Sequence, residues 1–155
     1  MNPLRRLAER LTRPLVVKRR LPKGFNRTPF YVAADAALGY LRPSLPAQEL
    51  LSIAMEFVEE GSVVWDVGAN VGMFTFAAAA CAGKTGSVIA IEADIWLADI
   101  IRKSTEIDEN RRLNIAVVPV AASDSSGVSR FLIANRGRMS SSLERSGHRS
   151  QAGGT

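Results

Sequence analysis

Residues 63–72 read VVWDVGANVG, and the organisation of the chain follows from them. The apolar, β-branched run at 62–67 predicts a strand buried on both faces, which is typical of parallel α/β sheets. Gly68 and Gly72 allow positive φ angles and let the backbone approach a ligand closely. The alanine-rich run at 73–82 has high helix propensity. A strand, a glycine loop and a helix in this order predict a cradle whose loop N–H groups and helix N-terminus face an anionic group.

The next predicted strand adds an acid to this cradle. Residues 87–91 read SVIAI and are followed by Glu92, twenty residues after Gly72. In nucleotide-binding α/β folds, an acid at the end of the second strand accepts hydrogen bonds from ribose hydroxyls. The pattern therefore predicts a ligand that contains a ribose.

The glycine spacing separates two classes of ribose ligand. A dinucleotide site needs G-x-G-x-x-G, but Asn70 stands at the second glycine position here and Gly72 follows two residues later. The loop also lacks the Lys-Ser/Thr ending of a P-loop. S-adenosylmethionine has no phosphate, so a loop shaped around its amino-acid end fits this spacing better. A nicotinamide-dependent oxidoreductase stays open as an alternative, because it shares the strand, the helix and the acid.

Periodicity places further elements around this core. Apolar residues at helical spacing predict a helix that begins near Ser44 and Pro46 and ends before Gly61. A helical stretch is expected at 94–113, a third strand at 114–120 and a further strand at 128–133. The stretch 21–46 is rich in Pro and Gly and is expected to be irregular structure packed on the domain. Trp65 and Trp96 are expected to be packing groups.

The first thirty residues form a basic arm, with nine Lys or Arg and the single acid Glu9. Leu4, Leu7, Ala8 and Leu11 lie on one face of a predicted helix, which Pro14 ends. This helix is expected to dock on the body, and weak contact with an anionic membrane is compatible with it. The rest of the chain carries a small net negative charge and gives no argument for nucleic-acid binding.

Composition excludes several classes of protein. The 155 residues suit one domain, and the single cysteine and single histidine exclude a disulfide framework, a cysteine-rich zinc site and a multi-histidine metal site. No apolar run approaches the ~18 residues of a membrane span. No signal-peptide pattern is visible, so a cytoplasmic location is expected.

Taken together, these segments resemble class I S-adenosylmethionine-dependent methyltransferases, and the D-V-G-A-N-x-G loop is most similar to the FkbM family. Residues 86–94, GSVIAIEAD, resemble that family's G-x-V-x-A-x-E-P-D segment, with Ala93 in place of the proline. Residues 114–124 resemble its third strand and the small-residue turn after it. Residues 127–143 resemble its next strand and serine-rich segment. The resemblance covers roughly residues 49–143.

The resemblance implies a Rossmann-like α/β fold, S-adenosylmethionine as cofactor and methyl transfer to an oxygen nucleophile. The acceptor would typically be a hydroxyl on a small molecule, either sugar-like (a glycan) or a natural product. The glycine loop would line the methionine end, Asp66 would hold the amino group or the loop, Glu92 would bind the ribose, and Ala122 would flank the adenine. No catalytic base is assigned. The implied cofactor-binding residues are Asp66, Gly68, Ala69, Asn70, Gly72, Glu92 and Ala122.

The chain departs from the family after its third or fourth strand. The later strands and the acidic D-x-E-G segment of a complete fold have no counterpart, so the domain is expected to be truncated. The expected divisions are a basic arm and accessory segment at 1–45, an incomplete core at 46–135 and a disordered tail at 136–155 that contains His148. The first strand would then expose an apolar edge. A half-domain binding module completed by oligomerisation is a second alternative.

Overall fold

The computed structural model describes residues 15–33, 48–133 and 142–143. The leucine-faced helix of the arm, the cap at Ser44 and Pro46, and His148 lie outside these residues, so their predictions stay untested. Within the described residues, no helix has the length and apolar character needed to cross a membrane.

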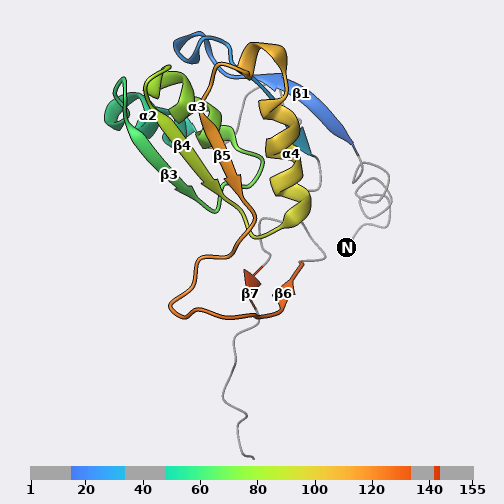
Figure 1. Cartoon of the computed structure of the whole chain (residues 1–155). Helices are drawn as coiled ribbons and strands as arrows, with labels where there is room; N and C mark the ends of the chain where they lie inside the picture. Colours follow the sequence, from blue (N-terminus) through green and yellow to red (C-terminus); the bar gives the residue numbers. More distant parts are fainter. Residues whose placement is uncertain (1–14, 34–47, 134–141, 144–155) are drawn as a thin grey trace, which may run out of the picture.

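The centre of the fold is a parallel sheet of three strands, which confirms the predicted α/β class (Figure 1). The strands are β3 (Val63–Val67), β4 (Ser87–Ile91) and β5 (Ile115–Val118), in the order β3-β4-β5. Trp65 pairs with Ile89, and Ile89 pairs with Ala116. All three strands run in the same direction, so the loops that follow them lie at one edge of the sheet.

Three helices accompany the sheet, and two of them connect its strands. They are α2 (Gln48–Phe57), α3 (Met73–Ala82) and α4 (Ile95–Thr105). The bounds of α3 match the prediction, as alanine propensity favours. The predicted helix at 94–113 ends earlier, because the backbone of Ile107 is extended and a 3-10 turn, η3 (Asp108–Asn110), follows. The Asn110 side-chain amide donates to the Ser104 carbonyl at 2.7 Å and so satisfies one of the helix's terminal acceptors.

The segment that precedes α2 is partly a hairpin, so the prediction of irregular structure at 21–46 was wrong for its first part. Strands β1 (Val16–Arg20) and β2 (Pro29–Ala33) pair antiparallel, joined by the 3-10 turn η1 (Lys23–Phe25) and by two residues at positive φ, Asn26 and Arg27. Pro29 is tolerated because it is the first residue of its strand. The expected packing is confirmed, since Leu21, Phe25, Phe30 and Val32 are all buried in the main core.

One face of the parallel sheet is open, which contradicts the prediction of a first strand buried on both faces. In β3 the side chains alternate between exposed and half-buried, and Trp65 is exposed instead of being a packing group. On the other face Val88 and Ala90 are fully buried beneath α3 and α4. The connecting helices lie on one side of the sheet, and no described element covers the other side. Trp96 does pack against the core as expected.

The end of the described chain also differs from expectation. The strand predicted at 128–133 is only β6 (Phe131–Leu132). It pairs antiparallel with β7 (Ser142–Leu143), which lies in the tail expected to be disordered, and it does not join the parallel sheet. The antiparallel partner of β6 is close in sequence, so pairing with it costs little loop-closure entropy.

Candidate cofactor site

The candidate site lies at the carboxyl ends of β3 and β4. The glycine loop at 68–72 follows β3 directly, and Glu92 follows β4, its hydrogen-bonded neighbour. Open parallel sheets bind ligands outside the carboxyl ends of their strands. The fold thus brings the loop and the acid together, as the sequence predicted.

The loop has three residues in the left-handed region. The φ angles are 84° at Gly68, 55° at Asn70 and 83° at Gly72. Glycine adopts this region without cost, and asparagine is among the few other residues that tolerate it. The loop therefore makes a tight, defined turn into α3, with Gly72 as the residue that precedes the helix.

Most N–H groups of the loop have partners inside the protein. Those of Gly68 and Ala69 donate to the Ile91 carbonyl at 2.9 and 3.0 Å, and that of Gly72 donates to the Ala69 carbonyl at 2.8 Å. The Asn70 N–H donates to Glu92 Oε2 at 2.7 Å. The expectation that these groups face an anionic ligand is therefore wrong for four of the five loop residues, because acceptors at the end of β4, on Glu92 and within the loop bind them.

Glu92 is a buried acid that organises the site. Only 8% of its surface is exposed, so it is not a solvated surface carboxylate. Its Oε1 accepts from the Asp94 N–H at 2.8 Å, while its Oε2 accepts from the Asn70 N–H. A carboxylate offers about four lone-pair sites, so each oxygen keeps capacity for one further donor. Glu92 thus links the loop to the start of α4 and keeps acceptor capacity for a ligand hydroxyl.

Of the two roles that the resemblance implied for Asp66, its hydrogen bond within the protein matches the one that holds the loop. Its Oδ2 accepts from the Thr75 hydroxyl at 2.5 Å, which ties the end of β3 to the first turn of α3. Thr75 is fully buried. Burial raises the pKa of Asp66 above its usual value of 3.8, and the hydrogen bonds from Thr75 oppose this rise in part. Asp66 therefore stabilises the loop by joining β3 and α3, the two elements on either side of it.

Asn70 carries an acceptor without a donor. Its side-chain Oδ1 is buried and has no hydrogen-bond partner. A buried polar atom left unpaired costs about 1–3 kcal/mol, and native proteins rarely leave one without a reason. The loop therefore has an unpaired acceptor in the residue whose N–H donates to Glu92, and the other such atom in the described residues is Asn110 Oδ1.

The other predicted residues divide into two groups. Gly68 is exposed, and a Cβ atom there would meet nothing within 4 Å, so this is the point where a ligand can approach the backbone. Ala69 and Gly72 are buried, and a Cβ at Gly72 would lie 3.1 Å from Phe76 and 3.2 Å from Ile101. Ala122 is exposed in the segment that follows β5.

Two residues of the site were not assigned a role from the sequence. Thr75 donates a hydrogen bond to Asp66, and no sequence motif predicts this contact. Asp94 donates its N–H to Glu92 and also caps α4, since its Oδ1 accepts from the Trp96 N–H at 3.0 Å. An acid directly before an apolar helix is an N-cap signal, so the role of Asp94 was readable.

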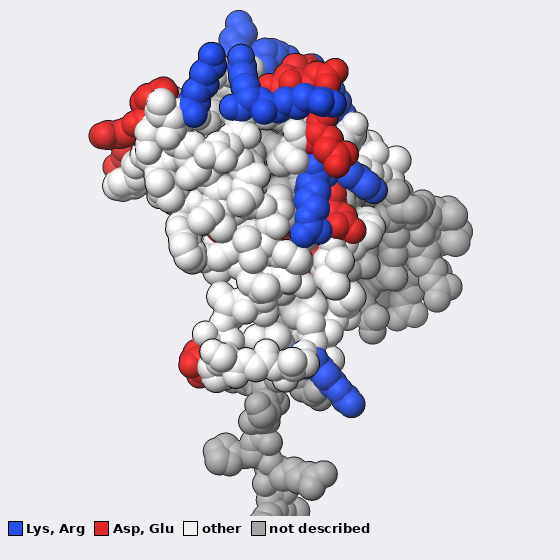
Figure 2. Space-filling model, in the orientation of Figure 1, with Lys and Arg blue, Asp and Glu red and all other residues white. Residues whose placement is uncertain are grey.

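A separate cavity of about 490 Å³ lies at the opposite end of the sheet. It is lined by residues that precede the strands, among them Glu60, Lys84 and Arg112, and by the β1–β2 hairpin. A five-residue strand spans about 17 Å, so this cavity is distinct from the candidate site. Figure 2 shows cations and acids gathered at this upper end of the molecule. No cluster of residues able to hold a metal ion occurs in the described part of the chain.

Comparisons with known proteins gave structural similarities only. No protein family matches the chain, and no curated protein matches it. A precorrin-6y C5,15-methyltransferase from Geobacter metallireducens is 20% identical over 52% of this chain, with a TM-score of 0.41. A SAM-dependent methyltransferase from Aquifex aeolicus is 19% identical over 57%, with a TM-score of 0.41. TYW2 from P. horikoshii, in complex with MeSAdo, is 17% identical over 66%, with a TM-score of 0.48.

The chain spans less than half the length of each of these structures, at 42%, 47% and 36% respectively. Membership of the FkbM family is not shown by these similarities. Two other similar structures carry RNA methylation in their names. The exclusion of nucleic acid as a partner of this chain stays a prediction.

Proposed function

We propose that this chain binds S-adenosylmethionine at the carboxyl ends of β3 and β4 and is the cofactor-binding part of a methyltransferase. The observation that carries the proposal is the pairing of an unused acceptor, Asn70 Oδ1, with a loop whose N–H groups are largely engaged. A site with free acceptors and few free N–H groups favours a ligand that donates hydrogen bonds.

This requirement discriminates between the two ribose ligands. A pyrophosphate has only acceptors and negative charge, and it would meet the Glu92 carboxylate next to a loop with few free N–H groups. The ammonium group of S-adenosylmethionine has three donors, which a pyrophosphate lacks, whereas the ribose hydroxyls are common to both ligands. Asn70 Oδ1 and Glu92 offer matching acceptors, so the polar groups of this site favour S-adenosylmethionine over a dinucleotide.

The chain's own residues would bind and orient the cofactor. Glu92 would accept from the ribose hydroxyls while it holds the Asn70 N–H. Gly68 would allow the methionine end to lie against the backbone. Asp66 would fix the loop through Thr75. When bound, the cofactor supplies a methyl group on a sulfonium centre, and the protein's task is positioning.

The proposed methyl acceptor follows from the sequence resemblance. The resemblance of residues 66–72 and 86–94 to FkbM enzymes favours a hydroxyl on a sugar-like or natural-product molecule. No described residue is assigned as a base for the hydroxyl proton.

The test is calorimetric titration of the full chain with S-adenosylhomocysteine and, separately, with NADH. Asn70→Gly removes the orphaned acceptor and keeps a residue that tolerates positive φ. A lost hydrogen bond to a charged group is worth about 1.5–3 kcal/mol, so this variant should bind roughly 10- to 150-fold more weakly. Glu92→Gln should also weaken binding.

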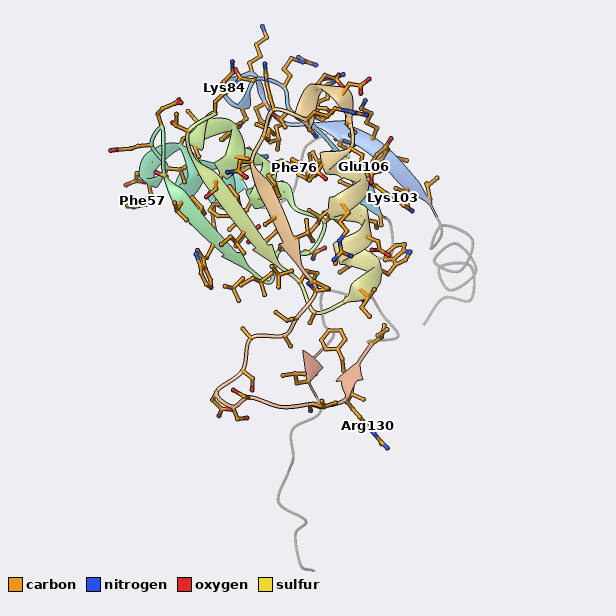
Figure 3. All side chains as sticks on the ribbon, viewed as in Figure 1. Phe57, Phe76, Lys84, Lys103, Glu106 and Arg130 are labelled. Carbon is orange, nitrogen blue, oxygen red and sulfur yellow. The ribbon has the colours of Figure 1, made fainter. Side chains whose placement is uncertain are left out.

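Glu106→Gln is the matched control, because Glu106 is exposed at the far end of α4 (Figure 3). It should bind S-adenosylhomocysteine like the unmodified chain. Saturable NADH binding without any S-adenosylhomocysteine binding would overturn the proposal in favour of an oxidoreductase. Unchanged affinity in Asn70→Gly would remove its central observation.

A further inference from the structure

The cavity at the amino ends of the strands has the size of a small-molecule pocket. Its volume of about 490 Å³ lies within the range of about 300–1,000 Å³ that is typical of ligand sites. Its walls are the β1–β2 hairpin, the end of α3 with the turn after it, and the segment before β5. Among the described lining residues only Glu60 precedes β3, so the cavity does not depend on what lies beside that strand.

Asn110 lines this cavity and carries a buried acceptor without a donor. Only 1% of the residue is exposed. Its side-chain amide donates to the carbonyls of Pro29 and Ser104, both at 2.7 Å, so its orientation is fixed and Oδ1 is the atom left unpaired. In the described residues the other such atom, Asn70 Oδ1, lies in the candidate cofactor site. A ligand that donates a hydrogen bond would satisfy Asn110 Oδ1.

Two cations at the cavity form no ion pair with any described residue. Lys84 and Arg112 line the cavity and are exposed, and Figure 3 shows Lys84 at the upper end of the molecule. Arg111 differs from its neighbour Arg112, because it pairs with Asp108 at 3.0 Å and does not line the cavity. Two uncompensated positive charges at one pocket favour an anionic ligand.

The two acids at the cavity do not cancel this attraction. Glu109 is held by Arg20, which donates to it at 2.8 Å and lowers its pKa, so this pair is neutral as a whole. Glu60 lies against Gly83, where a Cβ atom would collide with its carboxylate. The Thr85 hydroxyl donates to Glu60 Oε1 at 3.3 Å, so the Glu60 carboxylate keeps acceptor capacity for a further donor.

We propose that this cavity binds the phosphate ester of a hydroxyl-bearing small molecule, such as a sugar phosphate. Arg112 and Lys84 hold the phosphate, because a guanidinium matches phosphate oxygens with two parallel bonds and a lysine adds a point charge. A phosphate monoester carries about −1.5 to −2 charges at neutral pH, which suits two cations. Asn110 Oδ1 and Glu60 accept from the hydroxyls of the ligand.

This site is separate from the proposed cofactor site. The strands between the two sites span about 17 Å. Methyl transfer needs reacting atoms about 3–3.5 Å apart, so a ligand in this cavity is not the methyl acceptor. The proposal therefore does not rest on the proposed function.

Calorimetric titration of the full chain with ribose 5-phosphate, in phosphate-free buffer at low ionic strength, tests the proposal. Binding should be saturable and tighter than that of ribose or inorganic phosphate alone. Arg112→Gln and Lys84→Gln should each weaken it by roughly 10- to 150-fold, as expected for lost hydrogen bonds between charged groups. Arg111→Gln removes the same charge one position away and should bind like the unmodified chain. Arg112→Gln should still bind S-adenosylhomocysteine normally, which separates the two sites.

The side-chain amide of Asn110 offers a direct readout by nuclear magnetic resonance. Its two N–H signals should shift when ribose 5-phosphate is added and should keep their positions with inorganic phosphate alone. Asn114 is exposed and does not line the cavity, so its amide signals should not change with either compound.

Absence of saturable ribose 5-phosphate binding would overturn the proposal. Equal affinity for inorganic phosphate, or equal losses in Arg111→Gln and Arg112→Gln, would also overturn it, because either result indicates unspecific attraction to positive charge. Binding of short RNA strands by a chain that does not bind ribose 5-phosphate would replace the pocket with a basic surface for polyanions.

Discussion

Two carboxylates at neighbouring strand ends differ in what surrounds them. Glu92 accepts two backbone N–H groups, whereas Asp66 accepts the Thr75 hydroxyl beneath the loop. Burial raises the pKa of Asp66 from its usual value of 3.8. Asp66 is therefore the group whose ionisation opposes folding.

The pH dependence of stability should report this cost. A carboxyl whose pKa is raised in the folded state contributes stability below its ordinary pKa, and the contribution is lost as pH rises through the raised value. Asp66→Asn keeps an oxygen that can accept from Thr75 and removes the charge. Urea denaturation measures the unfolding free energy of both chains. The value for Asp66→Asn minus the value for the unmodified chain should therefore increase as pH rises from about 4 to neutrality. A constant difference across this range would contradict the assignment.

At the scale of single elements, the loop before α3 depends on two glycines for different reasons. Both have positive φ, but only Gly72 is packed, between Phe76 and Ile101. A Cβ at Gly68 would meet open space. The helix can start where it does because Gly72 lets its first turn lie directly on α4.

The two glycines provide a matched pair of variants. Gly68→Ala should cost about 1–2 kcal/mol of unfolding free energy, the cost of a left-handed backbone for an L-residue. Gly72→Ala adds overpacking to that cost and should reach about 2–5 kcal/mol. Thermal and urea denaturation of both variants measures the difference. Equal losses of unfolding free energy in the two variants would show that Phe76 and Ile101 can move aside for the new methyl group without strain.

At the scale of the whole molecule, the hairpin is fastened to the layer of helices by buried polar groups. The Tyr31 N–H donates to Ser104 Oγ at 2.8 Å, and the Asn110 amide donates to the carbonyls of Pro29 and Ser104, both at 2.7 Å. Arg20 also bonds Glu109 at 2.8 Å, but both groups are well exposed, so this pair adds little. Asn110 is therefore the main polar link between β2 and the end of α4.

Removal of that link should loosen the hairpin. Asn110→Ala removes a donor from the carbonyls of Pro29 and Ser104, of which that of Ser104 keeps the Ile107 N–H at 3.4 Å, so the unfolding free energy should fall by about 1–3 kcal/mol. Hydrogen exchange should accelerate first at β2. Asn114→Ala, at an exposed position, should change stability by less than about 0.5 kcal/mol. Unchanged exchange in β2 after Asn110→Ala would show that apolar packing alone holds the hairpin.

Local patterns by themselves determined the elements around the glycine loop. The alanine run predicted the bounds of α3, the β-branched runs predicted β3, β4 and β5, and the acid after β4 marked the end of the sheet at which we propose the cofactor site. These features are readable because propensity, turn chemistry and strand direction act over a few neighbouring residues. The hairpin was missed because Pro and Gly at 22, 24 and 29 look like loop signals, whereas two residues at positive φ turn the chain back.

Only the tertiary structure decided what each element faces. An apolar strand reads the same whether one face or both are covered, so VVWDV did not reveal that Val63, Trp65 and Val67 are exposed. The partners of Asp66 and Asn110 likewise lie on segments that are distant in sequence or carry no motif. Side-chain partners of this kind depend on how helices are laid on the sheet, and that arrangement is a property of the packed chain rather than of any stretch within it.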